Sequence, residues 1–352
     1  MEKKERLSNF EILRILAIMG VIVLHYNNRI YGNAFGLTEH NPVNHCMLMI
    51  LESLCVCSVD LFVIISGFFL SSRQKRNGFR IIELMVQVMF FSELKYLVTN
   101  RKYLTLGSLL GALLPNNYFV TLYAVLFFIS PLINVMLDEA SRQNALKRIL
   151  ITLFCVFSII PFCIDILSVI LRTNLNGMCT IGANGDQYGY TIVNFFLLYV
   201  IGAYLRNIQK KVTNLKLLAA IVVLIMVITC ISYWNENVAW EYCSPFVILL
   251  AVCLFLLFSN FNIGSIKLIN ELSGSVFTCF LVHGMFISHI HIDQFANMNP
   301  ILLFLHVLIS TLGIYLVSWF VWKCWNLIFK SVTKKIDEKK FIIDFFHYSN
   351  PI

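Results

Sequence analysis

The chain has 352 residues, of which 59% are hydrophobic and only 13% are charged, and its mean hydropathy is +0.78. About a quarter of the residues of a soluble domain are charged, so this composition excludes an ordinary soluble protein and indicates an integral membrane protein. The formal net charge of +8 could reflect a nucleic-acid partner, and the distribution of the basic residues along the chain has to decide that question.

Ten apolar segments are long enough to cross a bilayer, since a membrane-spanning helix needs about 20 mostly apolar residues. We predict these helices at 10–29, 46–70, 79–98, 117–137, 149–170, 191–206, 217–233, 245–260, 275–291 and 301–329. The third is the least typical because it contains Glu83, Glu93 and Lys95. Segment 101–115 is too short to span, and we place it at the membrane surface or as a re-entrant segment. The sequence therefore predicts an all-α membrane protein that forms a single domain over 1–352.

The positions of Lys and Arg indicate on which side of the membrane each connection lies. If the N-terminus is cytoplasmic, 20 of the 27 basic residues lie in the inward segments 1–9, 71–80, 138–148, 206–216, 261–274 and 330–352. The outward loops hold only Arg101, Lys102 and Arg172. This positive-inside pattern predicts that both termini are cytoplasmic, with 330–352 as a basic tail, in the cytoplasmic (inner) membrane of the cell. It also explains the net charge without a nucleic-acid partner.

Two costly polar side chains lie in the first predicted helix. Arg14 and His25 are eleven residues apart, which is three turns plus about 20°, so both lie on one face, about 16 Å apart along the axis. An ionisable group inside a membrane helix indicates a functional site. The alternative is that Arg14 extends to the membrane boundary and that His25 bonds to a neighbouring helix.

The second predicted helix ends in "SVDLFVIISGFFLSSRQKR" and carries Asp60 within the apolar span. Ser66 and Gly67 provide a small surface against which another helix can pack closely. Arg73 and Arg76 follow at the cytoplasmic edge, where two guanidinium groups three residues apart can bind one phosphate. Alternatively, the two arginines only fix the orientation of the helix in the membrane, as positive charges on its cytoplasmic side.

Further polar residues lie in or near the later spans. Asn117, Tyr118 and Tyr123 lie near the outer face of the fourth span, and His283 lies inside the ninth. With Ser66, these residues are candidates for lining a cavity or binding an acceptor. For His283, a hydrogen-bonded core position is the alternative.

The outward loops 171–189 and 234–243 combine aromatic and amide side chains, a composition that suits carbohydrate. The same residue types also occur in loops that bind nothing. His289, His291 and Asp293 cluster in a third loop, but this pattern has low specificity for a metal, and we expect no metal site.

Arg14 followed by ten residues and His25, "DLFVIISGFF" and the Arg73-x-x-Arg76 pair together resemble the acyltransferase-3 family of integral-membrane acyltransferases. The segments "YFVTLYAVLFFISPLIN", "LYVIGAYLR" and "SVFTCFLVHGMF" resemble the same family in the same order. The likeness runs from about residue 8 to at least residue 290. Tyr118 stands where many members have Trp, and Val63 where a second Phe is common; both changes are conservative.

The resemblance implies transfer of an acyl group, usually acetyl from acetyl-CoA, to a carbohydrate or another acceptor at or beyond the membrane. It implies that Arg14, Arg73 and Arg76 bind the phosphates of coenzyme A. His25 would deprotonate the acceptor hydroxyl, and Asp60 would orient or charge-balance His25. Direct attack on the thioester and a two-step route through an acylated imidazole both remain open. A transporter or flippase is the alternative function, and an inactive acyltransferase-like sensor is a third.

Overall fold

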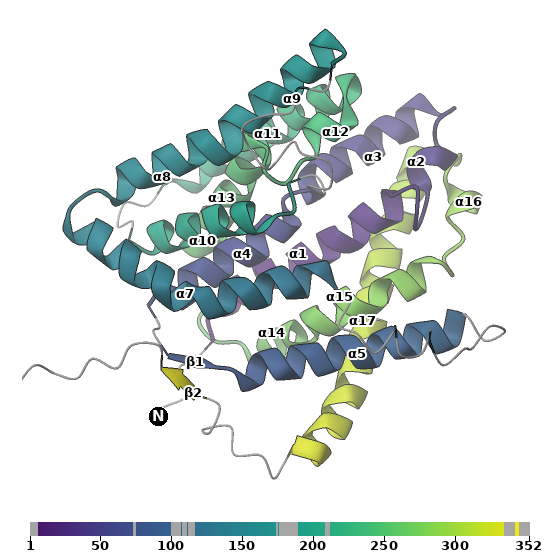
Figure 1. The fold of residues 1–352 in the computed structure, drawn as a ribbon. Coiled ribbons are helices and arrows are strands. Elements are labelled where there is room, and N and C mark those ends of the chain that lie inside the picture. The colour runs from purple at the N-terminus through teal and green to yellow at the C-terminus, as the bar shows by residue number, and fades with distance from the viewer. Residues whose placement is uncertain are drawn as a thin grey trace, which may run out of the picture.

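In the part of the chain that the structure describes, the elements are helices apart from one small two-stranded sheet (Figure 1). The computed structural model describes residues 6–72, 75–99, 107, 111, 117–173, 175, 189–207, 212–333 and 342–344. Within them, strands β1 (Lys75–Asn77) and β2 (Ile342–Asp344) pair antiparallel, with Arg76 opposite Ile343. The prediction of an all-α protein is confirmed in its main point. The loop 171–189, segment 101–115 and the tail 330–352 lie largely outside the described residues.

Each of the ten predicted spans coincides with helical residues. The longer helices are α1 (Ser8–Asn27), α3 (Pro42–Cys55), α4 (Ser58–Leu70), α5 (Phe79–Thr99), α7 (Tyr118–Arg142), α8 (Leu146–Phe154), α9 (Ile160–Leu171), α10 (Ile192–Asn207), α11 (Asn214–Trp234), α13 (Pro245–Asn260), α15 (Val276–Ile287) and α17 (Pro300–Thr333). The short ones are α2 (Ala34–Leu37), α12 (Glu236–Ala239), α14 (Lys267–Leu272) and α16 (Ile292–Phe295). A π-helical turn, Cys155–Ile159, joins α8 to α9, and a 3₁₀ turn, Ser273–Ser275, joins α14 to α15.

Six helical stretches among the described residues are long and apolar enough to cross a membrane. They are Ser8–Asn27, Pro42–Leu70, Tyr118–Arg142, Leu146–Leu171, Asn214–Trp234 and Pro300–Phe329. Helices α10 and α13 are apolar but shorter. The structure thus supports a multi-pass membrane protein, while the count of ten spans and the cytoplasmic termini stay predictions.

The predicted span 46–70 is divided into α3 and α4, which meet at the buried residues Val56 and Cys57. A break of this kind is tolerated at membrane depth where protein surrounds it. It places Asp60 in the first turn of α4. Because a helix N-terminus carries partial positive charge, the break offers the buried carboxylate a favourable field that a continuous helix would not.

The core lies where α1, α4, α10 and α13 pack together near the centre of the bundle (Figure 1). Each helix contributes fully buried side chains, such as Ile18, Ile64, Phe195 and Phe255. By contrast, few residues in the most apolar parts of α8–α9 and α11 are buried inside the protein, 17% and 28% respectively. Their outward apolar surfaces suit lipid, so the functional groups have to be sought around α1 and α4.

The predicted close-packing point is confirmed at Gly67, which lies between α4 and α10, whereas Ser66 lines a cavity. A Cβ atom added to Gly67 would lie 2.3 Å from the Tyr199 carbonyl oxygen, and one added to Gly202 would lie 2.2 Å from the Ile64 carbonyl oxygen. Each glycine therefore faces the backbone of the other helix. This contact brings α4, which lines the cavity described next, firmly against the core.

Candidate functional site

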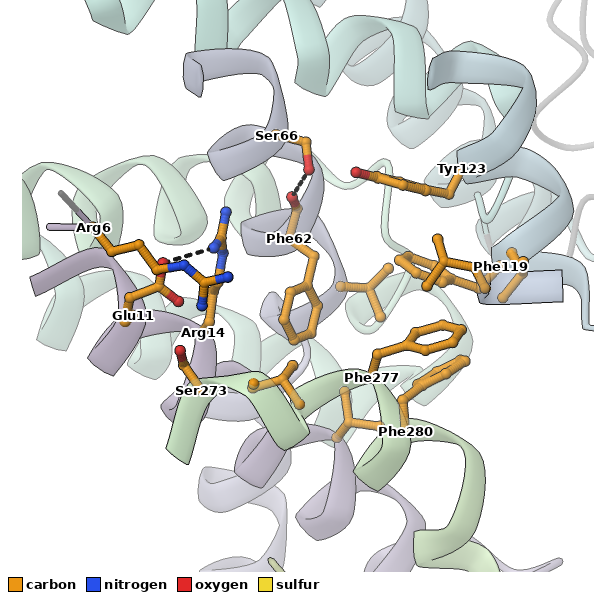
Figure 2. A pocket seen from close by; sticks show the side chains of 16 residues that line it. Arg6, Glu11, Arg14, Phe62, Ser66, Phe119, Tyr123, Ser273, Phe277 and Phe280 are labelled. Atoms are coloured by element: carbon orange, nitrogen blue, oxygen red, sulfur yellow. Dashed lines mark hydrogen bonds and ion pairs between the residues drawn. The ribbon is translucent and has the colours of Figure 1, made fainter. Parts of the chain in front are cut away.

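A cavity of about 340 Å³ lies between α1, α4, α7 and the start of α15 (Figure 2). We call it the arginine cavity, because Arg6 and Arg14 line one end of it. The Arg14 guanidinium donates to Glu11 Oε1 at 3.0 Å and lies 5.9 Å from the centre of the Phe69 ring. The rest of the wall is mainly aromatic, with Phe62, Phe119, Phe277 and Phe280, and hydroxyls come from Ser66, Tyr123 and Ser273. Cations at one end and aromatic rings at the other suit a ligand with an anionic head and a thin apolar arm.

A second cavity, of about 670 Å³, abuts the first. We call it the histidine cavity, because His25 and His283 line it. Lys95 and Ser92 of α5 also line it, together with Asn117, Tyr118, Tyr190 and Tyr242. The two cavities share the side chains Val21, Val59, Phe119 and Phe280. The shared wall lies between Arg14 and His25, so α1 carries one residue into each cavity.

The two histidines form a hydrogen-bonded pair across α1 and α15. His25 Nδ1 lies 2.6 Å from His283 Nε2, and the rings stack with their centres 4.7 Å apart. His283 Nδ1 lies 2.9 Å from the carbonyl oxygen of Cys279. The Tyr31 ring packs edge-on against His25, with the ring centres 4.6 Å apart. His283 is thus both a cavity wall and a hydrogen-bonded residue, the two roles that the sequence left open.

A third cavity, of about 330 Å³, lies on the other side of His25. We call it the acidic cavity, because Glu52 and Glu236 line it, and its wall also includes Arg29, Trp240 and Tyr242. Glu52 Oε2 accepts a hydrogen bond from Asn27 Nδ2 at 2.8 Å, and Arg29 pairs with Glu39 at 3.1 Å. The Trp240 ring stacks on Phe35, with the centres 5.3 Å apart. His25 and Tyr242 line both this cavity and the histidine cavity.

Two tyrosines outside the helices, Tyr190 and Tyr242, line the histidine cavity and stay neutral. Burial raises the pKa of Tyr242 well above its ordinary value, and the carboxylates of Glu52 and Asp60 raise it further. Burial, and then the Tyr242 phenol, raise the pKa of Tyr190 in the same way. Both side chains therefore keep their hydroxyl hydrogen and can donate it to a bound ligand.

Asp60 is completely buried and does not line any of the three cavities described here. Neither of its carboxylate oxygens has a hydrogen-bond partner among the described residues. The Nδ1 atom of His25 is hydrogen-bonded to His283 and not to Asp60, so the contact expected between Asp60 and His25 is not seen. The expected orienting role of Asp60 has no geometric support here.

Arg76 does not lie at the surface, as its predicted role in binding phosphate required. Its side chain is 2% exposed, and Nε and Nη2 donate to Ser130 Oγ of α7 at 3.0 and 2.7 Å. Its guanidinium lies 5.7 Å from the centre of the Phe127 ring. This burial does not favour the predicted role of Arg76 in binding phosphate at the cytoplasmic edge, and it arises because strand β1 directs Arg76 inward. Arg73 lies outside the described residues.

The five predicted cavity residues do line cavities. Ser66 and Tyr123 line the arginine cavity, whereas Asn117, Tyr118 and His283 line the histidine cavity. Asn117 also caps α7, because its Oδ1 accepts a hydrogen bond from the Val120 amide at 3.1 Å. Among the described residues, no three His, Cys, Asp or Glu side chains group as metal ligands.

Sequence reasoning did not name six charged residues that line these cavities as site candidates: Arg6, Glu11, Arg29, Glu52, Lys95 and Glu236. A signal existed for Glu52 and Lys95. Glu52 lies inside a predicted span, as Asp60 does, and Lys95 was one reason for regarding the third span as atypical. Arg6 gave no signal, because a basic residue before a first membrane helix is ordinary.

Comparison with known protein families matches residues 7–323 to the acyltransferase domain that defines the acyltransferase-3 family. No curated protein and no solved structure gives a significant match. The matched region includes α1, α4, α7 and α15, and therefore the walls of all three cavities except Arg6. The chain belongs to the acyltransferase-3 family and is a membrane acyltransferase.

Proposed function

We propose that the protein transfers an acetyl group from cytoplasmic acetyl-CoA to a hydroxyl of an extracytoplasmic carbohydrate, such as a capsular, exo- or cell-wall polysaccharide. His25 acts as the general base, and the protein resides in the cytoplasmic membrane. One observation carries this proposal: the arginine and histidine cavities abut, with Arg14 in one and His25 in the other.

The arginine cavity suits the donor. Coenzyme A has an anionic phosphate head, which guanidinium groups bind well, and a narrow pantetheine arm that ends in the thioester. Arg14 and Arg6 can take the head. The arm would then pass between Val21 and Phe280 toward His25, about 16 Å from Arg14 along α1.

The acidic cavity suits the acceptor. Carboxylates such as those of Glu52 and Glu236 accept hydrogen bonds from sugar hydroxyls, and the Trp240 ring offers an apolar face to a sugar ring. Because His25 lines this cavity as well as the histidine cavity, a hydroxyl and a thioester can meet at its imidazole.

In the direct reaction, His25 takes the hydroxyl proton while the oxygen attacks the thioester carbonyl. The carbon–sulfur bond then breaks, and the coenzyme A thiolate recovers the proton from His25. In the two-step reaction, the imidazole attacks first and passes the acyl group on. A transporter without chemistry of its own is less well supported, because the family match is to an acyltransferase domain.

The test is genetic and chemical. Deleting the gene should remove O-acetyl groups from the surface glycan, as measured by mass spectrometry. Wild-type protein should restore them, whereas His25→Ala, expressed at the same level, should lower acetylation about 10²–10⁴-fold. His289→Gln, a change at an exposed histidine, is the matched control. Full acetylation with His25→Ala would refute the role of this base.

A further inference from the structure

We propose that His283 is a positioning residue that fixes the tautomer of His25, so that His25 Nε2 is the one basic nitrogen of the pair. This inference rests on the proposed function, since it assigns the atom that takes the acceptor proton. It stands on two distances and on the chemistry of a backbone carbonyl, and it assigns a role in the reaction to a residue of α15.

The Cys279 carbonyl sets the first proton. A carbonyl oxygen can only accept a hydrogen bond, so the contact of 2.9 Å with His283 Nδ1 requires a hydrogen on that nitrogen. A neutral imidazole carries one N–H, and Nε2 of His283 is therefore an unprotonated acceptor. Because Cys279 lies one turn before His283 on α15, the helix itself maintains this contact.

The second proton follows from the first. His25 Nδ1 lies 2.6 Å from the unprotonated His283 Nε2, and two nitrogens at this distance need one hydrogen between them. That hydrogen must belong to His25 Nδ1. The remaining nitrogen, His25 Nε2, then carries a lone pair that can take a proton from a bound hydroxyl. His25 lines both the histidine and the acidic cavity, where a donor thioester and an acceptor hydroxyl would meet.

This arrangement accounts for the whole path of the proton. The acceptor oxygen forms its bond to the thioester carbon as its proton moves to His25 Nε2, and His25 becomes an imidazolium. Its Nδ1–H still donates to His283 Nε2, and that charge-assisted bond stabilises the cation. When the carbon–sulfur bond breaks, the thiolate takes the proton from Nε2 and leaves His25 in its starting tautomer. His283 exchanges no proton, because its Nδ1–H is held by a carbonyl that cannot accept one.

In this pair, His25 is the base and His283 is the group that orients it. The orienting group is a neutral imidazole, whereas it is more usually a carboxylate. In serine proteases, a wrong histidine tautomer lowers kcat about 10⁴-fold without disturbing the fold. If His283 had only a structural role, replacements that keep the hydrogen-bond acceptor and replacements that lose it would have the same effect on activity.

Two variants separate these roles. His283→Gln can present its amide oxygen near the position of Nε2, whereas His283→Leu has similar bulk and no acceptor. With purified full-length protein in proteoliposomes, we expect His283→Leu to lower kcat at least 10²-fold with the KM for acetyl-CoA within twofold. His283→Gln should recover at least tenfold of that loss. Equal activity of the two variants would overturn the proposal, as would wild-type activity of His283→Leu.

The tautomer itself can be measured without any acyl transfer. In protein labelled with ¹⁵N-histidine, the His25 signals, identified by their loss in His25→Asn, should show a pyridine-type Nε2 and a pyrrole-type Nδ1. His283→Leu should shift His25 toward the Nε2–H tautomer. A pyrrole-type Nε2 in the wild-type protein would overturn the proposal, and this reading needs no folded variant of His283. Absence of acetyl transfer by the wild type, with the expected spectrum, would refute the proposed function and leave the tautomer assignment standing.

Discussion

Arg14 and Arg76 carry the same charge, yet their surroundings give them different tasks. The Arg14 side chain is 32% exposed and lines the arginine cavity. The Arg76 side chain extends from β1 and is buried against α7. A guanidinium that faces a cavity can bind a phosphate. One whose N–H groups are already satisfied inside the protein stabilises the fold instead.

For Arg14, we expect the Gln variant to weaken the binding of acetyl-CoA without changing the rate of the chemical step. Loss of one charge-assisted contact to a phosphate should raise the KM for acetyl-CoA about tenfold and change kcat little, because the base is unaffected. Steady-state kinetics in proteoliposomes gives both constants. Arg142→Gln, at an exposed ion pair on α7, is the control. An unchanged KM would contradict a donor role for Arg14.

For Arg76, we expect the opposite result. Arg76→Gln leaves Ser130 with a weaker partner and should destabilise the protein by about 1–3 kcal/mol, seen as a lower Tm in detergent. The KM for acetyl-CoA should stay the same. Arg80→Gln, four residues along and exposed, should change neither quantity. A raised KM with an unchanged Tm would instead restore Arg76 to the donor site.

Glu52 tests the acceptor side at the same scale. Glu52→Gln removes a carboxylate from the acidic cavity and keeps the bulk of the side chain, so the KM for the glycan acceptor should rise while the KM for acetyl-CoA holds. Glu139→Gln, at an exposed ion pair with Arg142, serves as the control. Equal effects on donor and acceptor would argue for a general structural role of Glu52.

At the scale of elements, the site depends on how closely α4 packs on α10. Ser66 and Val59 line the arginine cavity from α4, and two glycines hold α4 against the backbone of α10. The positions of these side chains therefore depend on the contact that a neighbouring face of the same helix makes with α10.

We expect Gly67→Ala to destabilise the protein by about 1–3 kcal/mol and to lower activity with it, because the new methyl group would meet the Tyr199 backbone, which cannot move aside cheaply. Thermal unfolding in detergent measures the loss. A glycine of α17 gives the control, since a Cβ added to Gly313 meets nothing within 4 Å. Gly313→Ala should be neutral or stabilising by up to about 1 kcal/mol. Equal stability of the two variants would show that the close approach is not needed.

At the scale of the whole molecule, the three cavities follow α1 from its Arg14 end past His25. With the N-terminus inside, this order places donor binding near the cytoplasmic face and acceptor binding toward the other. Under the proposed function, the membrane would separate the pools of the two substrates, and the protein would provide the path between them.

Vesicles of known orientation test this sidedness. We expect acetyl transfer when acetyl-CoA is supplied on the cytoplasmic side and the acceptor glycan on the opposite side, because only that arrangement matches the order of Arg14 and His25 along α1. Vesicles with both substrates on the cytoplasmic side should give little product. Transfer in that case alone would contradict the proposed path across the membrane.

Features that depend on local periodicity and composition could be predicted from the amino-acid sequence. Apolar length placed the helices, the spacing of Arg14 and His25 put them on one face of α1, and the small residues at Ser66 and Gly67 marked a helix contact. The motifs also indicated the family that the match over 7–323 then showed. Each of these features is decided within one or two turns of helix, or by short segments in a fixed order.

Only the tertiary structure decided which of the costly polar residues meet. His283 lies 258 residues from His25 in the chain, and Glu52 and Tyr242, from a helix and a loop far away in the sequence, line a cavity together with His25. Asp60 had the same sequence signal as His25, but neither of its carboxylate oxygens has a hydrogen-bond partner among the described residues, and a short strand directs Arg76 inward. The cost of burying a polar group reveals that it needs a partner, but the identity of the partner depends on helix packing over long sequence separations.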